Sequence, residues 1–227
     1  MQPYFFPYIG YFQLLASVDT FVFYDDVNFI KNGWINRNRM LLAGEVRYIT
    51  VPLQGASSFS KINQIAIQPG SLWREKMIES VRHAYSKAPN FSDINELLSE
   101  VLFAEESDIS SLAKSSVIAI SNYLELNRRF VMSSAGYNNA ELNGEVRVCD
   151  ICLKEKASEY FNLPSGRTLY DEDVFSSKGI QLRFIHPNLR AYPQFSEEFH
   201  PALSILDVLM FNEKDLVREM LFTGEIS

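Results

Sequence analysis

The opening segment MQPYFFPYIGYF places the strongest constraint on how this chain folds. Pro3 and Pro7 each fix φ and remove a backbone donor, so the segment predicts a stiff loop. Six of its residues are aromatic. A protein core has no use for so many tyrosine hydroxyls, because each buried hydroxyl needs a hydrogen-bond partner. We therefore expect a loop that presents polar groups to a ligand, with the candidates Gln2, Tyr4, Tyr8 and Tyr11.

The next two segments predict a helix and a buried strand. Residues 10–17 carry apolar side chains at helical spacing, and TFVFY at 20–24 is an apolar run typical of a strand buried on both faces. This strand ends at Asp25 and Asp26. Strand carboxyl ends border a crevice in an open α/β sheet, so the loop and the aspartate pair predict a ligand site. The alternative is a rigid aromatic mini-core with aspartates that cap a loop.

Further along the chain, short apolar runs alternate with helical patterns. We expect a β-hairpin from strands at 39–42 and 47–53, and further strands at 62–67, 129–133, 159–161 and 181–185. We expect helices at 71–85, 92–103, 109–126 with Asp108 as N-cap, 143–156, 171–177 and 203–211. These elements predict an α/β fold, with a partly parallel sheet, flanking helices, a β-hairpin and a mainly helical middle segment. Residues 1–227 are expected to form one domain, with a helical sub-lobe at about 71–126 as an open alternative.

A polar and aromatic segment follows the aspartate pair. Arginine forms bidentate hydrogen bonds to anions and tryptophan stacks on flat groups, so this segment suits an anion such as a diphosphate. The alternative is a solvated turn whose asparagine side chains bond to their own backbone. The candidate binding residues here are Lys31, Trp34, Asn36, Arg37, Asn38 and Arg39.

Two later segments supply further candidates. SGRTLYD at 165–171 combines a glycine turn with hydroxyls at a helix start, an arrangement that cradles an anion or merely caps the helix. Tyr170 is its candidate binding residue. The loop at 186–201 is long and aromatic, which predicts an ordered wall or lid over a pocket. Tyr192 and Gln194 are its candidates.

Composition excludes several classes of protein. The chain has 21 basic and 28 acidic residues, a net charge of −7, which argues against general nucleic-acid binding. No apolar run is long enough to enter and span a membrane, and the N-terminus lacks the basic region of a signal peptide, so we expect a cytoplasmic protein. Cys149 and Cys152 form a single CxxC without a second ligand pair, so no metal site is expected. Nucleophile-elbow, P-loop and dinucleotide-binding motifs are all absent.

The motifs together resemble the WbqC-like family. The segments that carry the likeness are MQPYFFPYIGYFQL, FVFYDDVNFIKNGWINRNRML, TVPL, SGRTLYD, GIQLRF, YPQF and LSILD, which span residue 1 to about 212. Genes of this family lie among those for O-antigen and other surface polysaccharides. The resemblance therefore implies work on a nucleotide-activated sugar, and we expect the attachment of an acyl or aminoacyl group to its amine. Family members usually carry several more apolar residues before the QP motif, which form the first strand, whereas here Met1 directly precedes Gln2. If that strand is missing, a central strand is absent.

Two functions remain open. In the first, a transferase, Lys31 and Arg37 hold the diphosphate, and Asp25 or Asp26 takes a proton from the sugar amine as general base. Tyr4, Tyr8 or Tyr11 then donates to the developing oxyanion. In the second, the chain is a non-catalytic protein that binds a sugar nucleotide or scaffolds the polysaccharide machinery. The sequence names no cofactor, and the acyl donor and the oligomeric state, monomer or homodimer, stay open.

Overall fold

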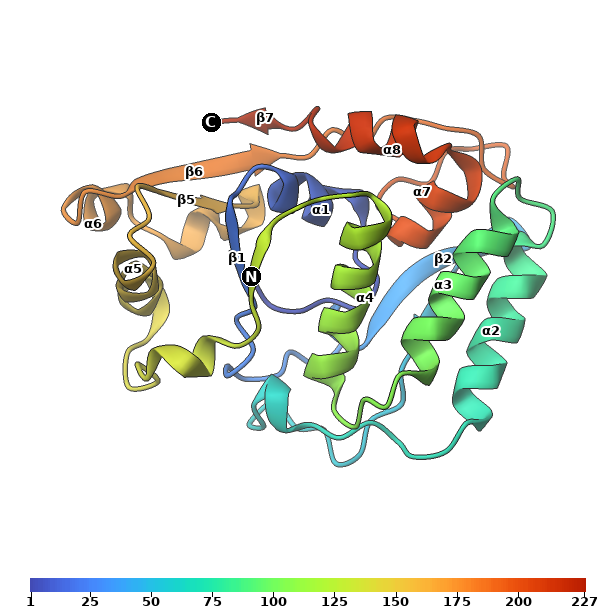
Figure 1. Cartoon of the computed structure of the whole chain (residues 1–227), viewed down its shortest axis with the longest axis horizontal. Helices are drawn as coiled ribbons and strands as arrows, with labels where there is room; N and C mark the ends of the chain where they lie inside the picture. Colours follow the sequence, from blue (N-terminus) through green and yellow to red (C-terminus); the bar gives the residue numbers. More distant parts are fainter.

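The computed structural model describes residues 1–227, in which helices alternate with short strands (Figure 1). The N-terminal loop leads into α1, β1 and the β2–β3 hairpin, and the helices α2 to α4 follow. The bounds are α1 (Ile9–Ala16), β1 (Thr20–Val22), β2 (Arg37–Leu42), β3 (Glu45–Thr50), the 3-10 helix η1 (Ile62–Gln64), α2 (Leu72–Tyr85), α3 (Phe91–Phe103), α4 (Ile109–Tyr123), β4 (Arg129–Val131), η2 (Ser134–Tyr137), α5 (Gly144–Lys154), β5 (Glu159–Asn162), η3 (Pro164–Leu169), α6 (Glu172–Ser176), β6 (Gln181–His186), α7 (Ile205–Phe211), α8 (Lys214–Leu221) and β7 (Glu225–Ile226).

The strands form three small sheets. β1 pairs in parallel with β4, and β5 pairs in parallel with β6, whose far end pairs antiparallel with β7. β2 and β3 form the antiparallel hairpin, with Arg37 opposite Thr50. The predicted α/β class is therefore confirmed, including its parallel pairing, its hairpin and its helical middle segment. The parallel pairing comes as two separate strand pairs instead of one continuous sheet.

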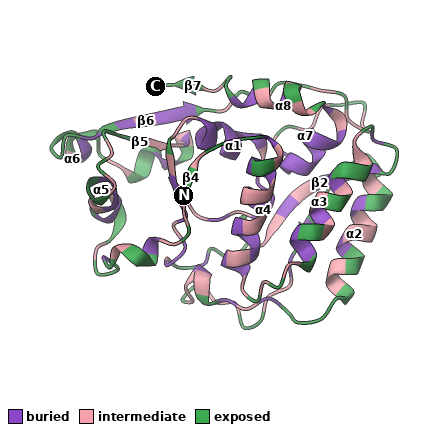
Figure 2. Cartoon of the chain, in the orientation of Figure 1, coloured by how far each residue is buried: buried purple, intermediate pink, exposed green.

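The three middle helices lie beside the hairpin (Figure 1). α2 contacts β2, and α3 contacts both α4 and α7. Each helix turns an apolar stripe inward, where Val81, Leu98 and Val117 are wholly buried. The opposite sides of α2 and α3 carry the exposed residues (Figure 2). Asp108 caps α4 as predicted, because its carboxylate accepts a hydrogen bond from the backbone N–H of Ser111 at 2.9 Å. None of the helices combines the length and apolar character needed to cross a bilayer.

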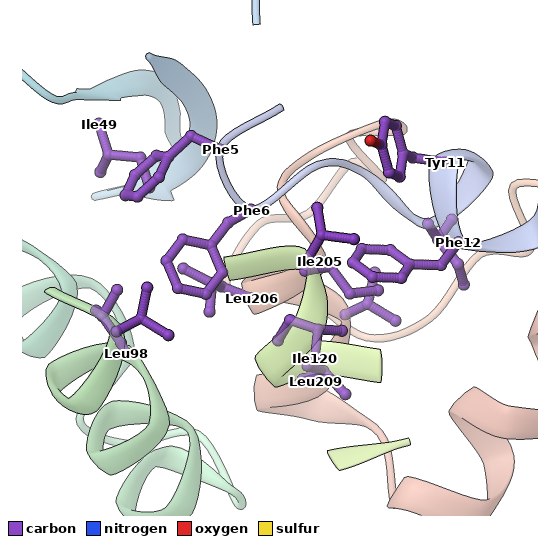
Figure 3. Packing of buried hydrophobic residues seen from close by; sticks show 14 of the residues in the cluster. Phe5, Phe6, Tyr11, Phe12, Ile49, Leu98, Ile120, Ile205, Leu206 and Leu209 are labelled. Atoms are coloured by element: carbon purple, nitrogen blue, oxygen red, sulfur yellow. The ribbon is translucent and has the colours of Figure 1, made fainter. Parts of the chain in front are cut away.

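Most buried apolar residues belong to a single core. This cluster of 41 residues joins the N-terminal loop and α1 with the hairpin, the middle helices and α7 and α8. Figure 3 shows Phe5 lying next to Ile49 of β3, and Phe6 lying between Leu98 of α3 and Leu206 of α7. The aromatic loop thus contributes to the core through Phe5 and Phe6, whereas Tyr4 and Tyr8 are only partly buried.

A smaller core organises residues 144–186, which we call the α5–β6 unit. Its seven buried residues come from α5, α6, β6 and the turn before β6, and they are Val148, Cys149, Cys152, Phe175, Ile180, Leu182 and Phe184. The rings of Tyr160 and Phe175 stack at 5.4 Å beside this cluster. In Figure 1 the unit lies at the end of the molecule opposite to α2.

The N-terminal loop is held in place by side chains from distant segments. Phe6 has a φ of 40°, a conformation that costs free energy for a bulky residue and needs support from its surroundings. The backbone N–H of Phe6 donates to Ser116 Oγ at 3.0 Å, and its carbonyl accepts from Asn38 Nδ2 and Ser204 Oγ, both at 2.8 Å. Three bonds to three separate elements therefore fix the course of the loop.

Several predicted elements differ from the structure, and several observed elements were not predicted. Residues 62–67 were predicted as a strand but form η1 and then isolated bridges of Ala66 to Asp108 and of Ile67 to Leu53. Ala66 and Ile67 pair with two different segments, so residues 62–67 do not form a continuous ladder with one strand. The helix predicted at 203–211 begins at Ile205. α8 and β7 were not predicted, although α8 carries apolar residues at helical spacing.

β1 is shorter and less buried than its apolar sequence predicts. It ends at Val22, and Thr20 and Val22 are only half-buried. The reason is that β4 covers one edge of β1, whereas the other edge borders a large cavity. On that edge, the Met1 amino group donates to the Val22 carbonyl at 2.9 Å, and the Tyr24 N–H donates to the Met1 carbonyl at 2.8 Å. No strand of residues 1–227 lies between β1 and β5.

Candidate functional site

A cavity of about 1360 Å³ lies between the main core and the α5–β6 unit. Part of its wall consists of β1 and β5 themselves, each of which has a free edge. The rest of the wall includes residues of the N-terminal loop, the segment after β1, β2, the segment around Lys61, the start of α5 and the segment after β5. Its polar and aromatic side chains include Gln2, Tyr4, Tyr8, Tyr24, Asn28, Trp34, Arg39, Lys61, Asn143, Arg147 and Tyr170. We call this second part the polar wall.

Two tyrosines of the N-terminal loop lie on the polar wall, and a third does not. Burial, with a smaller contribution from Tyr4, raises the pKa of Tyr8 to about 12, and burial also raises the pKa of Tyr4. Both hydroxyls therefore stay protonated and can donate hydrogen bonds at neutral pH. Tyr11 is wholly buried, and its hydroxyl donates to the carbonyl of Gln2 at 2.9 Å. Its part in the site is to hold the loop.

Gly10 makes room for Tyr8. A Cβ atom at position 10 would lie between 2.5 and 2.7 Å from the Cε2, Cζ and hydroxyl atoms of Tyr8. Real Cβ atoms do not approach other atoms so closely, so any larger residue would push the ring away. The glycine thus sets the position of the Tyr8 hydroxyl in the cavity.

Asp25 lies behind the cavity wall in a complete set of hydrogen bonds. It is 1% exposed, and its Oδ2 accepts from Lys114 Nζ at 2.7 Å and from Ser110 Oγ at 3.0 Å. Its Oδ1 accepts from Ser133 Oγ at 2.6 Å. Lys114 also donates to the carbonyl of Met132 at 2.8 Å. The carboxylate thereby ties α4 to the segment after β4.

Asp26 forms an ion pair with Arg147 of α5. Burial alone would raise the pKa of Asp26, but hydrogen bonds from Ser134 and Arg147, together with the charge of Arg147, outweigh it and lower the pKa. Arg147 also donates from Nε to Asn139 Oδ1 at 3.0 Å. Asn139 is held in turn, because its Nδ2 donates to Asp150 Oδ2 at 2.6 Å. Arg147 lines the cavity and Asp26 does not. The carboxylate therefore orients a cation that faces the cavity.

The candidates of the polar segment separate into two groups. Trp34 and Arg39 reach the cavity, and the Arg39 guanidinium lies 5.5 Å from the Trp34 ring. Arg37 and Lys31 do not line the cavity. Arg37 donates from Nε to the carbonyl of Gly33 at 3.2 Å and lies over the ring of Tyr48. The predicted grip on a diphosphate by these two cations therefore has no support in their placement.

The two asparagines of this segment bind backbone groups. Asn36 donates to the carbonyl of Val51 at 2.9 Å and joins the end of β3 to the turn before β2. Asn38 is buried and donates to the carbonyls of both Phe5 and Phe6, at 3.1 and 2.8 Å. Asn38 borders the cavity, whereas Asn36 does not. These bonds reach backbone groups 15 to 33 residues away, so they differ from the alternative in which the asparagines bond to the backbone of their own turn.

The later candidates also divide. Tyr170 lies on the polar wall, whereas Tyr192 and Gln194 bind Asp207 away from the cavity. The Asp207 carboxylate accepts from Tyr192 at 2.7 Å, from Gln194 at 2.8 Å and from Tyr85 at 2.7 Å. Burial raises the pKa of Asp207, although these hydrogen bonds oppose the shift. This network fastens the long loop at 187–203 to α2 and α7.

The cysteines are two free thiols in the smaller core. Cys152 borders the cavity, but burial, with a smaller contribution from Cys149, raises the pKa of Cys152 to about 12. A thiol that stays protonated is a poor nucleophile. No group of three or more His, Cys, Asp or Glu side chains is placed to hold a metal ion.

Lys61 and Arg147 are cavity residues that the sequence analysis did not single out. Lys61 lies beside Asn28, with which it forms an isolated backbone bridge. Arg147 stands among the buried residues Val148, Ile151 and Cys152 of α5. An arginine on the apolar face of a predicted helix was the available signal, because a buried cation must find a partner. Its partner Asp26 is 121 residues away, so no local spacing reveals the pair.

Comparison with known proteins agrees with the motifs. A sequence model described as the WbqC-like protein family matches residues 2–219. A protein of Mycobacterium tuberculosis (strain ATCC 25618 / H37Rv), named "Uncharacterized protein Rv1507c", is 34% identical over 214 residues. The match covers 93% of this chain and 91% of that protein. No solved structure matches this chain.

Proposed function

The chain belongs to the WbqC-like protein family, and from this premise we propose that it transfers an acyl or aminoacyl group to the amine of a nucleotide-activated amino sugar. The observation that supports the proposal is the polar wall of the cavity. Aromatic side chains for a sugar and a base lie there with cations for phosphates, namely Arg39, Lys61 and Arg147. The proposal places this reaction in the biosynthesis of O-antigen or another surface glycan.

Tyr8 is the residue that we assign to the chemical step. The amine nitrogen forms a bond to the acyl carbonyl carbon, and the bond from this carbon to the donor's leaving group breaks. One amine proton is released and leaves with that group. Negative charge develops on the carbonyl oxygen in between, and a hydrogen-bond donor aimed at this oxygen lowers the barrier. Tyr8 meets the requirement because its hydroxyl borders the cavity and stays protonated.

The two aspartates take supporting roles in this proposal. Neither carboxylate lines the cavity, and each is paired with a cation, Asp25 with Lys114 and Asp26 with Arg147. A carboxylate with a lowered pKa is a weak proton acceptor. We therefore assign Asp26 to the orientation of Arg147. The general-base role considered from the sequence becomes the competing assignment.

Product formation tests the proposal. The purified protein would be incubated with a panel of nucleotide-activated amino sugars and three donor classes, an acyl thioester, an aminoacyl-tRNA, and an amino acid with ATP. Mass spectrometry should detect a sugar nucleotide that has gained one acyl or aminoacyl group. The matched control replaces each amino sugar with its hydroxyl counterpart, which lacks the nucleophile. The proposal fails if no donor and acceptor pair gives this product.

One observation favours a second function, that of a non-catalytic protein that binds or presents the sugar nucleotide. The one cysteine that borders the cavity, Cys152, is held as the thiol and so supplies no thiolate nucleophile. A binding protein would show saturable binding of the same sugar nucleotides, with no change in their mass in a cell lysate that supplies every donor. Binding without product would favour this second function over the transferase.

A further inference from the structure

Arg147 has an unusual position for a cation that borders a cavity. Its side chain is 4% exposed, and it projects from the first half of α5. Nε donates to Asn139 and Nη2 donates to Asp26, and a further side-chain hydrogen bond joins the guanidinium to Tyr24. The guanidinium also lies 5.0 Å from the ring of Tyr24, which borders the same cavity. Arg147 is therefore held by three side chains, and a guanidinium with five N–H donors keeps donors for a ligand.

The start of α5 supplies more unused donors at the same place. Asn143 and Gly144 border the cavity together with Arg147. α5 has 11 residues, and its N-cap residue Asn143 makes no side-chain capping bond. The N–H groups of Gly144, Glu145 and Val146 have no hydrogen-bond partner in the protein. Free N–H groups and the helix dipole make a helix start attractive to anions.

We propose that Arg147 and the start of α5 form a phosphate-binding subsite, which takes the diphosphate of the nucleotide-activated sugar. The inference rests on the proposed function for the identity of the ligand, but the binding of a phosphate group is testable without it. With the diphosphate in this subsite, the sugar would lie against the part of the wall that the N-terminal loop contributes, which includes Tyr4 and Tyr8. Asp26 offsets the charge of Arg147 and fixes its direction, so recognition depends on geometry.

This dependence on geometry separates arginine from lysine. Arginine presents several donors in a fixed fork, so it can hold Asn139, Asp26 and a ligand at the same time. Lysine retains the charge but has a single nitrogen. Arg147→Lys should therefore keep the ion pair with Asp26 and lose the donors that the guanidinium has left over for a ligand.

Calorimetric titration with inorganic pyrophosphate at low salt tests the subsite. The wild-type protein should bind, and Arg147→Lys should weaken the affinity by about 10-fold or more, since charge-assisted hydrogen bonds are the strong ones. Asn143→Asp is a second variant that does not endanger the fold, because aspartate is as good an N-cap as asparagine. It places a negative charge at the helix start and should weaken pyrophosphate binding by about 10-fold. The control Asn127→Asp adds the same charge at an exposed position and should bind as the wild type does.

The outcomes decide the subsite separately from the proposed function. If the wild-type protein binds no pyrophosphate, or if Arg147→Lys and Asn143→Asp both bind it as tightly as the wild type, the subsite is wrong. Acylated product from the wild-type enzyme would leave the proposed function standing in that case. Loss of pyrophosphate binding in both variants without any acylated product would support the subsite and reject the transferase.

Discussion

The carboxylate of Asp26 accepts a hydrogen bond from the guanidinium of Arg147, a residue 121 positions further along the chain. The pair joins the segment after β1 to the α5–β6 unit across one side of the cavity. It therefore contributes to the fold and also orients a cation in the candidate site. A change at either residue should be visible in both stability and ligand binding.

Asp26→Asn should make the free energy of unfolding less dependent on pH in the acidic range. The pKa of Asp26 is lowered in the folded protein, so the unfolded state binds the proton more readily. The stabilising contribution is fully present above the ordinary aspartate pKa of 3.8 and is lost as the pH falls through the lower folded value. Urea unfolding should show the largest difference between wild type and variant at neutral pH, and a smaller one below pH ~4. A difference that stays constant or grows toward acid would contradict this.

The same variant separates the two roles considered for Asp26. If Asp26 orients Arg147, Asp26→Asn should raise KM for the sugar nucleotide and leave kcat within a few-fold of the wild type. If Asp26 is the general base, kcat should fall by about two orders of magnitude or more, and its pH profile should lose the acidic limb. We expect the first result, which steady-state kinetics between pH 5 and 9 would measure.

Tyr8→Phe should lower kcat by about 100-fold, because removal of one oxyanion donor has an effect of this order. The fold should be retained, since the Tyr8 hydroxyl forms no hydrogen bond with the protein. Tyr48→Phe is the matched control, because Tyr48 is 52% exposed on β3 and lies outside the cavity. A kcat for Tyr8→Phe that equals that of the control would remove Tyr8 from the chemical step.

Gly10→Ala tests the position of the same hydroxyl by a different route. The new methyl group would displace the Tyr8 ring, so kcat should fall while the tyrosine itself is still present. Alanine has a higher helix propensity than glycine by about 1 kcal/mol, which partly offsets the strain within α1. Thermal unfolding should therefore change less than activity does. Full activity in Gly10→Ala would show that the reaction does not depend on where this ring lies.

Asn38→Ala should destabilise the protein by about 2–4 kcal/mol, because it leaves the Phe5 carbonyl without its donor and removes one of the two donors to the Phe6 carbonyl. Asn36→Ala is the comparison. Asn36 donates to one carbonyl and is less buried than Asn38, so its substitution should cost about 1 kcal/mol. Urea unfolding would measure both. Equal effects of the two substitutions would mean that Asn38 does not hold the N-terminal loop in the way described.

A designed N-terminal extension tests the free strand edges that border the cavity. Met1 already pairs with Val22 and Tyr24 in the pattern of a parallel ladder, and β5 offers a second free edge. About five apolar β-forming residues fused ahead of Met1 match the usual length of a strand and should continue this ladder. The melting temperature should rise relative to a glycine–serine extension of equal length. Equal melting temperatures would show that the space between β1 and β5 does not accept a strand.

Local patterns in the sequence predicted much of the fold. The apolar run at 20–24, the hairpin around Gly44 and the N-cap Asp108 each depend on neighbouring residues, and each has its predicted place in the structure, although the strand at 20–24 is shorter. The failure at 62–67 has a different origin, because its residues find partners in two different segments. Contacts with distant segments determine the structure of residues 62–67, and the spacing of apolar residues in the sequence does not reveal those contacts.

The candidate site was less predictable for the same reason. The N-terminal loop and the aspartate pair were recognisable as polar groups after a buried strand. Whether a side chain reaches the cavity depends on partners 89 and 121 residues away, Lys114 for Asp25 and Arg147 for Asp26. Arg37, in contrast, is bound by its own turn and lies outside the cavity. Residue type indicated the kind of chemistry, and long-range contacts determined which residues are placed for it.

The binding of a nucleotide-activated amino sugar in the cavity is the central claim, and a thermal-shift screen tests it most directly. Wild type and Arg147→Lys would be measured with a panel of these sugars. A ligand at 100 times its dissociation constant adds about 2.7 kcal/mol of stability, which is a readily measured rise in melting temperature. We predict that rise for the wild type with at least one sugar nucleotide and a smaller rise for Arg147→Lys. The absence of a shift with every member of the panel, or equal shifts in the two proteins, would contradict the account.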